Sequence, residues 1–384
     1  MKTFKCSCEN NQILFFESKF CVACNRVVGV DDNFNKVEAY DLDEKSGFYF
    51  KTTQVNIPYQ KCDNYNNYEA CNGMVNMDSF IPAPDKDEVL CLACRLNETI
   101  PDLSVIEHIP LWKKMEAAKR RAIYTLKALS LPVENIIENK ESGLSFDFIT
   151  DGDVKDHFLS KLEDEEVVFT GHDNGHITIN LAEADEVARS NAKLAMSEKY
   201  RTVLGHFRHE LGHYYFEKLI IDSPKKHELS KKYFGDDDLD YSKALKKYYK
   251  DGPSKNWEND FISEYATMHP YEDWAETWAH YMHIIDTLET AKNFNMTGSI
   301  TGKEVGILNL PQDSYFFSFQ TSISSILDTW MDFAVILNSL NRSMGMNDAY
   351  PFVLTPSVRT KLSFIHHAIH DRLDELSDIP NAKG

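Results

Sequence analysis

The sequence contains no long hydrophobic run, no excess of basic residues and no cysteine after residue 94. No stretch approaches the roughly 18 apolar residues of a membrane-spanning helix, and the first residues, MKTFKCSCENNQ, lack the apolar core of a signal peptide. The 41 Lys and Arg residues against 60 Asp and Glu residues give a net charge of −19. This charge argues against nucleic acid as a partner and does not favour anionic membranes. We therefore expect a cytoplasmic protein with neither partner.

The eight cysteines, all within residues 1–94, indicate metal or redox chemistry more than disulfides in a cytosolic chain. Two C-x-x-C pairs, CVAC at 21–24 and CLAC at 91–94, can each turn both sulfurs toward one Zn²⁺, and four thiolates complete a tetrahedral site. The βαβ context of a redox-active pair is missing. We predict two structural zinc ions in a zinc-ribbon-like region over residues 1–100. In chain order the two sets are Cys6, Cys8, Cys21 and Cys24, and Cys62, Cys71, Cys91 and Cys94, while an interleaved grouping stays open.

The rest of the chain has an α+β layout. RLNETIPDLS (95–104) is typical of a linker, because a proline is unfavourable inside a helix. An amphipathic helix is predicted over 106–130, followed by three strand-like runs, LSFDFIT, EVVFT and HITINLA, the last two joined by the turn GHDNG. The remainder is predicted to be mainly helical, over 185–220, 238–250, 257–267, 271–292, 318–342 and 356–376. We expect a second domain, 105–384, that is mainly helical with a small mixed sheet.

One predicted helix carries the motif HELGH at residues 209–213. Two histidines at i and i+4 point the same way and can bind one zinc ion, and the glutamate after the first can take a proton from water. The expected zinc ligands are His209 and His213, with Glu210 as general base. The structural alternative is a helix with surface histidines. A third ligand on another helix would favour the catalytic interpretation, because catalytic zinc sites use three protein ligands and keep one position open.

The third ligand distinguishes the groups of zinc peptidases. The metzincin pattern requires Gly and His where this chain has Phe216 and Leu219, so that pattern fails. A thermolysin-like arrangement takes a glutamate from a later helix with an acidic residue four positions on. EDWAE at 272–276 supplies both: Glu272 would complete the triad, and Glu276 would accept the ring N–H of a ligand histidine.

These segments resemble known families. HELGH with SEYATMHPYEDWAE is similar to the Glu-type zinc peptidases typified by anthrax lethal factor and the bacterial Pro-Pro endopeptidases, in which a tyrosine seven residues before the ligand glutamate assists the transition state. The matching residue here is Tyr265. Most of the chain also resembles a bacterial zinc-binding metallopeptidase family with an N-terminal zinc ribbon. The segments that carry this resemblance are the paired cysteines, CRLNETIPDL, LGHFRHELGHYY and EYATMHPYEDWAETWAHY. The resemblance implies a zincin-like fold and one catalytic zinc, but no particular substrate.

The predicted activity is hydrolysis of peptide bonds in a peptide or protein substrate, with Glu210 as general base and Tyr265 donating to the oxyanion. HITIN is a candidate edge strand for pairing with an extended substrate. The absence of the GxMEN signature of large zinc aminopeptidases favours an endopeptidase or a specialised processing enzyme. Two alternatives are a zinc-stabilised binding or adaptor protein with a vestigial or regulatory peptidase site, and a zinc-ribbon nucleic-acid binder, which the net charge disfavours.

The histidines outside the HELGH motif have simpler interpretations. His206 is predicted to pack beside the site or to support it without binding the metal. His280 and His283 continue the later helix beyond the metal, because eight residues of helix span about 12 Å. We predict that both pack or face the substrate side. The motif FIHHAIH at 364–370 is interpreted as a surface helix face.

Overall fold

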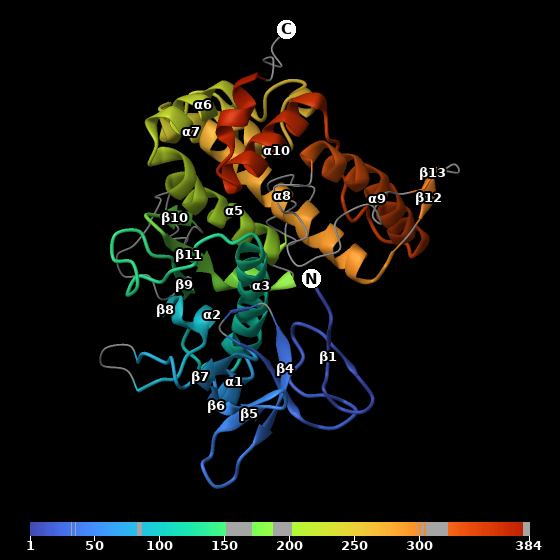
Figure 1. Cartoon of the computed structure of the whole chain (residues 1–384). Helices are drawn as coiled ribbons and strands as arrows, with labels where there is room; N and C mark the ends of the chain where they lie inside the picture. The colour runs from blue at the N-terminus through green and yellow to red at the C-terminus, as the bar shows by residue number, and fades with distance from the viewer. Residues whose placement is uncertain are drawn as a thin grey trace. The chain divides into compact units, whose positions relative to one another are not determined.

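A computed structural model of the whole chain describes residues 1–31, 33–34, 36–82, 87–150, 171–186, 202–296, 298–300, 303–304 and 322–378. The chain forms two compact units, Met1–Ala192 and Lys193–Gly384. The first contains sheets and a long helix, and the second is mainly helical (Figure 1). The predicted α+β class is confirmed. No helix within the described ranges is both long and apolar enough to cross a bilayer.

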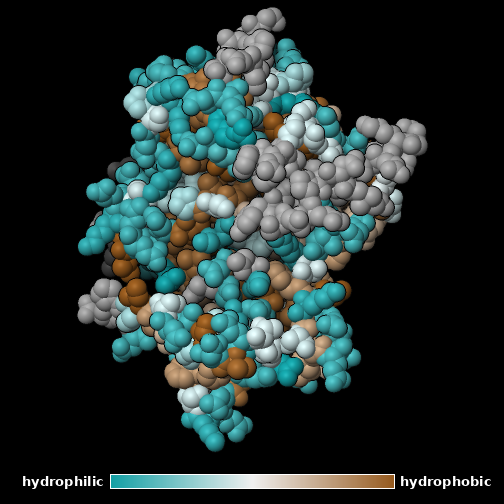
Figure 2. Space-filling view, viewed as in Figure 1, coloured by the Kyte–Doolittle hydropathy of each residue, from teal (hydrophilic) through white to brown (hydrophobic). Residues whose placement is uncertain are grey.

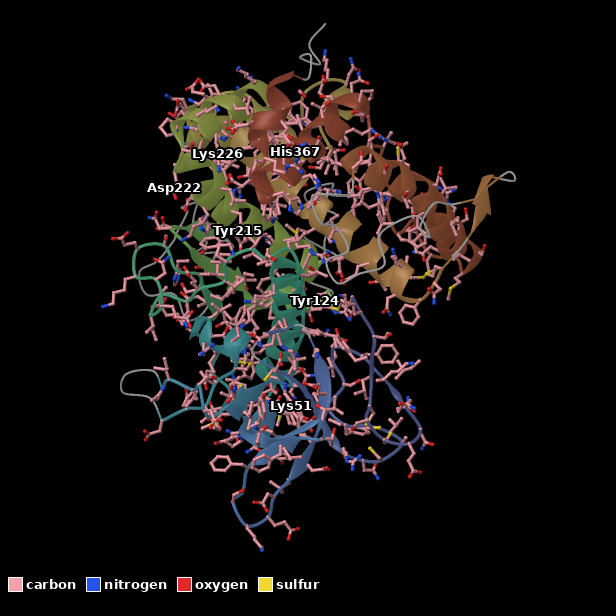
Figure 3. The ribbon with its side chains drawn as sticks, viewed as in Figure 1. Lys51, Tyr124, Tyr215, Asp222, Lys226 and His367 are labelled. Atoms are coloured by element: carbon pink, nitrogen blue, oxygen red, sulfur yellow. The ribbon has the colours of Figure 1, made fainter. Side chains whose placement is uncertain are left out.

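The N-terminal unit begins with the cysteine-rich region. A two-stranded sheet, β1 (Phe4–Lys5) and β2 (Ile13–Leu14), precedes a five-stranded antiparallel sheet in the order β3-β4-β5-β6-β7. The strands of the larger sheet are β3 (Val27–Val30), β4 (Val37–Leu42), β5 (Tyr49–Lys51), β6 (Gln54–Lys61) and β7 (Met74–Asn76). Two short helices, α1 (Asp63–Tyr68) and α2 (Leu92–Arg95), lie beside the later cysteines. Lys51 on β5, labelled in Figure 3, forms buried ion pairs with Asp31 at 3.1 Å and Glu38 at 2.6 Å.

A long helix, α3 (His108–Ala128), confirms the prediction for 106–130. Its apolar positions, among them Trp112, Met115 and Ile123, are fully buried at helical spacing. Arg120 on the same helix donates to Asn72, whose amide in turn donates to the backbone carbonyls of Phe16 and Ser18. These bonds join α3 to the cysteine-rich segment inside one unit.

A four-stranded mixed sheet completes the N-terminal unit in the order β10-β11-β9-β8. Its strands are β8 (Asn97–Thr99), β9 (Ser145–Ile149), β10 (Gly171–Asp173) and β11 (His176–Asn180), and a 3₁₀ turn, η1 (Leu181–Ala184), follows. In β9 and β11 the alternate residues Phe146, Phe148, Ile177 and Ile179 are buried, as the period of two requires. Asn174 and Gly175 both have positive φ and close the β10–β11 hairpin, so the predicted turn is confirmed.

Two predictions about this sheet are wrong. HITIN is no open edge, because β11 pairs with β10 on one side and with β9 on the other. The segment 95–104 is more than a linker, because Asn97–Thr99 forms a strand parallel to β9. The predicted strand EVVFT lies outside the described residues, as does much of the helix predicted over 185–220.

The C-terminal unit is built around α8 (Pro270–Asn293), which packs against α5 (Val203–Phe216) and α10 (Pro356–Ile369) (Figure 1). A π-helical turn, η2 (Glu217–Ile221), extends α5. The other helices are α6 (Pro224–Phe234), α7 (Tyr241–Asp251) and α9 (Ile323–Ser343), with short 3₁₀ turns η3 (Trp257–Asn259), η4 (Tyr265–Thr267) and η6 (Leu373–Asp378). The described strands here are the pair β12 (Ser299–Ile300) and β13 (Lys303–Glu304). Hydrophilic residues cover the outer faces of α6 and α7 (Figure 2).

The predicted helices near 241–251, 270–293 and 323–343 are confirmed within a few residues, whereas 356–376 is a helix to Ile369 and then a 3₁₀ turn. The helix predicted over 257–267 is wrong: the segment contains two separate 3₁₀ turns. Side chains form hydrogen bonds with backbone groups of this segment instead. Ser263 Oγ accepts from the Ala266 N–H, and Lys361 donates to the Asp260 carbonyl. Helix α6 was not predicted.

Candidate metal centre

The candidate metal centre lies where α5 and α8 cross at close range. A Cβ atom on Gly212 would lie 3.0 Å from Ala275 Cα, so the small residues at these two positions set the distance between the helices. Trp274 Nε1 donates to the Gly212 carbonyl at 2.8 Å. Tyr215, which lies on α5 in Figure 3, stacks on Trp278 with ring centroids 5.0 Å apart. The aromatic and small residues of both motifs therefore hold the two helices in one register.

This packing brings the three predicted ligands together. His209 Nε2 lies 2.9 Å from Glu272 Oε2 and 3.1 Å from His213 Nε2, and His213 Nε2 lies 3.5 Å from Glu272 Oε1. All three side chains are buried. Tetrahedral zinc with bonds of about 2.0–2.1 Å places neighbouring ligand atoms about 3.3 Å apart. The donor set and its spacing thus fit Zn²⁺ held by two imidazoles and one carboxylate.

Glu276 lies at the position predicted for it. Its Oε1 is 2.6 Å from His209 Nδ1, the ring nitrogen that faces away from Glu272, and its Oε2 accepts a bond from Ser263 Oγ at 2.6 Å. A carboxylate on the far nitrogen of a ligand histidine fixes the tautomer and the ring orientation. Burial raises the pKa of Glu276, but the hydrogen bond with His209, the charges of His209 and His280 and the bond from Ser263 together outweigh burial and hold this pKa at about 2.

The helix start of α8 contributes to the charge state of Glu272. His269 caps the helix by accepting from the Tyr271 N–H, and Pro270 and Glu272 lie in the first turn, where the helix dipole favours negative charge. Burial raises the pKa of the Glu272 carboxyl, yet the neighbouring His213 and His209 lower it well below its usual value. The carboxylate is therefore ionised, as a metal ligand must be.

Glu210 and His206 form a pair beside the three ligands. His206 Nε2 lies 3.3 Å from Glu210 Oε1, one helical turn away on α5. Burial raises the pKa of Glu210, but the bond with His206 and the charges of His209 and His213 lower it below its ordinary value. Glu210 is thus a buried carboxylate in the form that accepts a proton. The contact agrees with the supporting role predicted for His206.

Tyr265 lies in η4, with its ring centroid 6.0 Å from that of His209. Its phenol lies close to that of Tyr241, a residue that the sequence did not indicate. Tyr241 Oη donates to Glu272 Oε1 at 2.8 Å. Tyr271 was also missed, and its ring stacks on His213 with centroids 4.1 Å apart. Neither residue belongs to a spaced motif, although Tyr271 adjoins Glu272 in the sequence.

The two later histidines of α8 have packing roles. His280 is buried, its Nδ1 lies 2.8 Å from Tyr350 Oη, and burial lowers its pKa to about 4. His283 Nδ1 accepts from Arg208 Nη1 at 2.6 Å, and Arg208 also donates to Asp286 at 2.6 Å. In FIHHAIH, His366 is buried on α10, so the surface interpretation is wrong for this residue.

The eight cysteines form two groups in chain order. Cys6, Cys8, Cys21 and Cys24 make one group, and Cys62, Cys71, Cys91 and Cys94 the other. All are free thiols. The Cys6–Cys24 and Cys8–Cys21 sulfur distances are 3.7 and 4.0 Å. Zinc–sulfur bonds of about 2.3 Å in a tetrahedron place sulfurs about 3.8 Å apart, so the first group has the spacing of a four-thiolate zinc site.

A further polar group lies on the mixed sheet of the N-terminal unit. His176 Nε2 is 2.5 Å from Asp147 Oδ2, and its Nδ1 is 3.2 Å from Glu98 Oε2 and 2.9 Å from Ser145 Oγ. The hydrogen bond with Asp147 raises the pKa of His176. Carboxylates face both ring nitrogens, which is the arrangement of a charged histidine between two anions.

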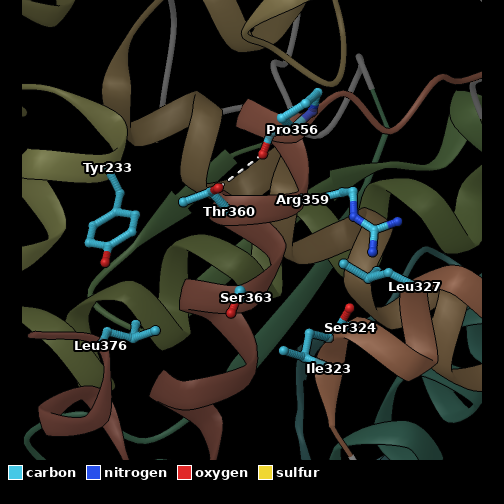
Figure 4. A pocket seen from close by; sticks show the side chains of 9 residues that line it. All are labelled: Tyr233, Ile323, Ser324, Leu327, Pro356, Arg359, Thr360, Ser363 and Leu376. Carbon is cyan, nitrogen blue, oxygen red and sulfur yellow. Dashed lines mark hydrogen bonds between the residues drawn. The ribbon is translucent and has the colours of Figure 1, made fainter. Parts of the chain in front are cut away.

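A pocket of about 330 Å³ opens between α6, α9, α10 and η6 (Figure 4). Its lining is mainly apolar, with Arg359 on one side, and none of the predicted site residues takes part. Arg359 Nη2 is bonded to Asp328 at 2.7 Å. The pocket is therefore separate from the histidine and glutamate group.

Comparison with known proteins places the chain in a family. Residues 108–368 match the model of the family described as "Putative zinc-binding metallo-peptidase", and residues 3–105 match a zinc-ribbon domain. Uncharacterized proteins of Mycobacterium bovis and Mycobacterium tuberculosis are 35% identical over 372 residues, which is 97% of this chain and 96% of theirs. No solved structure matches. The chain belongs to the family of zinc-binding metallo-peptidases that this model describes, with an N-terminal zinc ribbon.

Proposed function

We propose that the chain is a zinc-dependent endopeptidase that hydrolyses peptide bonds in a peptide or protein substrate. The observation that carries the proposal is the convergence of His209, His213 and Glu272 with the buried carboxylate of Glu210 beside them. These three ligands would hold one zinc ion. When bound, zinc acts as a Lewis acid and lowers the pKa of a coordinated water to about 7.

The residues of the chain supply the remaining chemistry. Glu210 would accept the proton of the attacking water and return it to the nitrogen of the leaving amine. Tyr265 would donate its hydroxyl hydrogen to the oxyanion, the role that the likeness to lethal factor implies. Glu276 would hold the ring of His209. A zincin-like fold for residues 105–384, a cytoplasmic location and a zinc-ribbon region ending near residue 100 complete the proposal.

The experiment compares wild type with Glu210→Gln on a library of peptides. The variant removes the base and leaves the ligands, so cleavage should fall by at least about 10²-fold while the zinc content is unchanged. Glu228→Gln, at an exposed position on α6, is the matched control and should cleave like wild type. Retained cleavage in Glu210→Gln would contradict the assignment. Absence of cleavage by wild type across the library would favour a zinc-stabilised binding protein.

A further inference from the structure

Tyr241 differs from the rest of its helix. Helix α7 has no buried residue and its outer face is hydrophilic. Tyr241 occupies its first position, directly after Asp240, whose side chain caps the helix by accepting from the Lys243 N–H. The residue keeps 39% of its surface exposed, whereas its hydroxyl donates to Glu272, which is 2% exposed. The residue therefore contributes a polar contact to the site more than apolar area to the core.

The start of α7 is attached to the start of α8. His269, the cap residue of α8, has its Nε2 3.0 Å from the Leu239 carbonyl, and its ring lies 5.3 Å from that of Tyr241. The two helix starts thus approach each other next to Glu272. This attachment gives the Tyr241 hydroxyl a defined position relative to the Glu272 carboxylate.

The Tyr241 hydroxyl fixes one oxygen of that carboxylate. It donates to Oε1 at 2.8 Å, while Oε2 lies 2.9 Å from His209 Nε2. A buried carboxylate held at both oxygens loses the freedom to rotate about its terminal torsion. The phenol of Tyr265 lies close to the same hydroxyl. Tyr241 therefore contacts the third ligand and lies beside the proposed oxyanion donor.

We propose that Tyr241 is a positioning residue of the metal centre, which orients Glu272 for zinc. The inference rests on the proposed function only for the identity of the metal. It assigns α7 a role in metal retention. Removing a side chain that hydrogen-bonds a metal ligand typically lowers metal affinity or activity by 10- to 100-fold.

The test compares Tyr241→Phe with Tyr233→Phe, a matched hydroxyl deletion on α6, in the full chain. Zinc release from the histidine and glutamate site is measured by competition with a chelator. The protein is also loaded with cobalt, because thiolate ligands give charge-transfer bands that separate the cysteine sites from the His–His–Glu site. We expect Tyr241→Phe to weaken zinc binding at the latter by about tenfold and to shift its visible cobalt bands. Tyr233→Phe should change neither.

Unchanged zinc release and unchanged cobalt bands in Tyr241→Phe would overturn the proposal, and so would equal changes in both variants. Thermal unfolding of each variant shows whether a shift in metal binding comes from a less stable fold. Tyr265→Phe separates metal binding from stabilisation of the oxyanion, because it should slow cleavage without weakening zinc binding. The binding measurements need no substrate, so a failure of the peptidase proposal and a failure of this inference give different results.

Discussion

At the scale of the residue, carboxylate contacts separate histidines that suit metal binding from histidines that pack. His209 has carboxylates at both ring nitrogens, and although burial lowers its pKa, Glu272 and Glu276 raise it well above the usual value. His280 and His366 are buried beside tyrosine hydroxyls, and burial lowers their pKa values to about 4 and about 3. Sequence spacing alone does not distinguish these two environments.

The buried neutral His366 predicts an acid-sensitive contribution to stability. Its Nδ1 lies 2.8 Å from Tyr281 Oη, and its folded pKa of about 3 lies below the unfolded value of about 6.5. The unfolded state therefore binds a proton that the folded state does not, and stability is lost as the pH falls below about 6.5. Between about pH 7.5 and 5.5 this loss amounts to about 1 kcal/mol.

The measurement is the free energy of unfolding by denaturant at both pH values. His366→Gln, which keeps a hydrogen-bond acceptor but does not titrate, should lose about 1 kcal/mol less than wild type over this interval. His108→Gln, in the first turn of α3, serves as the control. An identical pH dependence in wild type and His366→Gln would show that His366 has the same pKa in the folded and unfolded states, and would contradict the prediction.

At the scale of the element, periodic segments were predictable and elements built on few buried residues were not. The apolar spacing in α3 and the motifs in α5 and α8 predicted three helices that the structure contains. Helix α6 buries only Ser230 and Phe234, so its sequence carries no apolar stripe. Tyr241 lies 31 residues before its partner Glu272, and Ser263 lies 13 residues before its partner Glu276. Only the folded chain brings these pairs together.

The crossing of α5 and α8 predicts a sharp limit on side-chain size at Gly212. A Cβ atom there would lie 3.0 Å from Ala275 Cα and 3.2 Å from Ala275 O, and these are backbone atoms that cannot rotate away. Gly212→Val should therefore force the helices apart, costing about 1–3 kcal/mol of stability, and weaken zinc binding by moving Glu272. Thermal unfolding and zinc content measure both effects.

Gly171→Val is the matched control, because a Cβ on this residue of strand β10 meets no atom of the described part of the chain within 4 Å. It should leave both stability and zinc content close to those of wild type, since valine is favourable in a strand. A Gly212→Val variant as stable as wild type would mean that the two helices can separate without loss, and the close crossing would then have no part in holding the ligands.

At the scale of the whole molecule, candidate metal ligands occur in both compact units. Within the described ranges, four groups bring metal-binding side chains together: the two cysteine sets and the Glu98, Asp147 and His176 group in the first unit, and the His209, His213 and Glu272 group in the second. Four thiolates leave no position for substrate, whereas two histidines and one glutamate leave one open. We therefore propose a structural role for zinc at the two cysteine sets and a catalytic role at the His209, His213 and Glu272 group.

The metal content per molecule tests this assignment. Wild type should contain about three zinc ions, because the two cysteine sets and the His–His–Glu group are buried or nearly so and each suit one, while the group on the mixed sheet has a single imidazole and an exposed Glu98. Glu272→Ala should reduce the content to about two and leave the cysteine sites filled.

Cys91→Ser should also remove one zinc, but with a loss of folded structure in the N-terminal unit, because four-thiolate sites contribute directly to folding. Elemental analysis with circular dichroism separates these cases. A fourth zinc that Asp147→Asn removes would instead show that the group on the mixed sheet binds metal, and an unchanged content in Glu272→Ala would place the third catalytic ligand elsewhere.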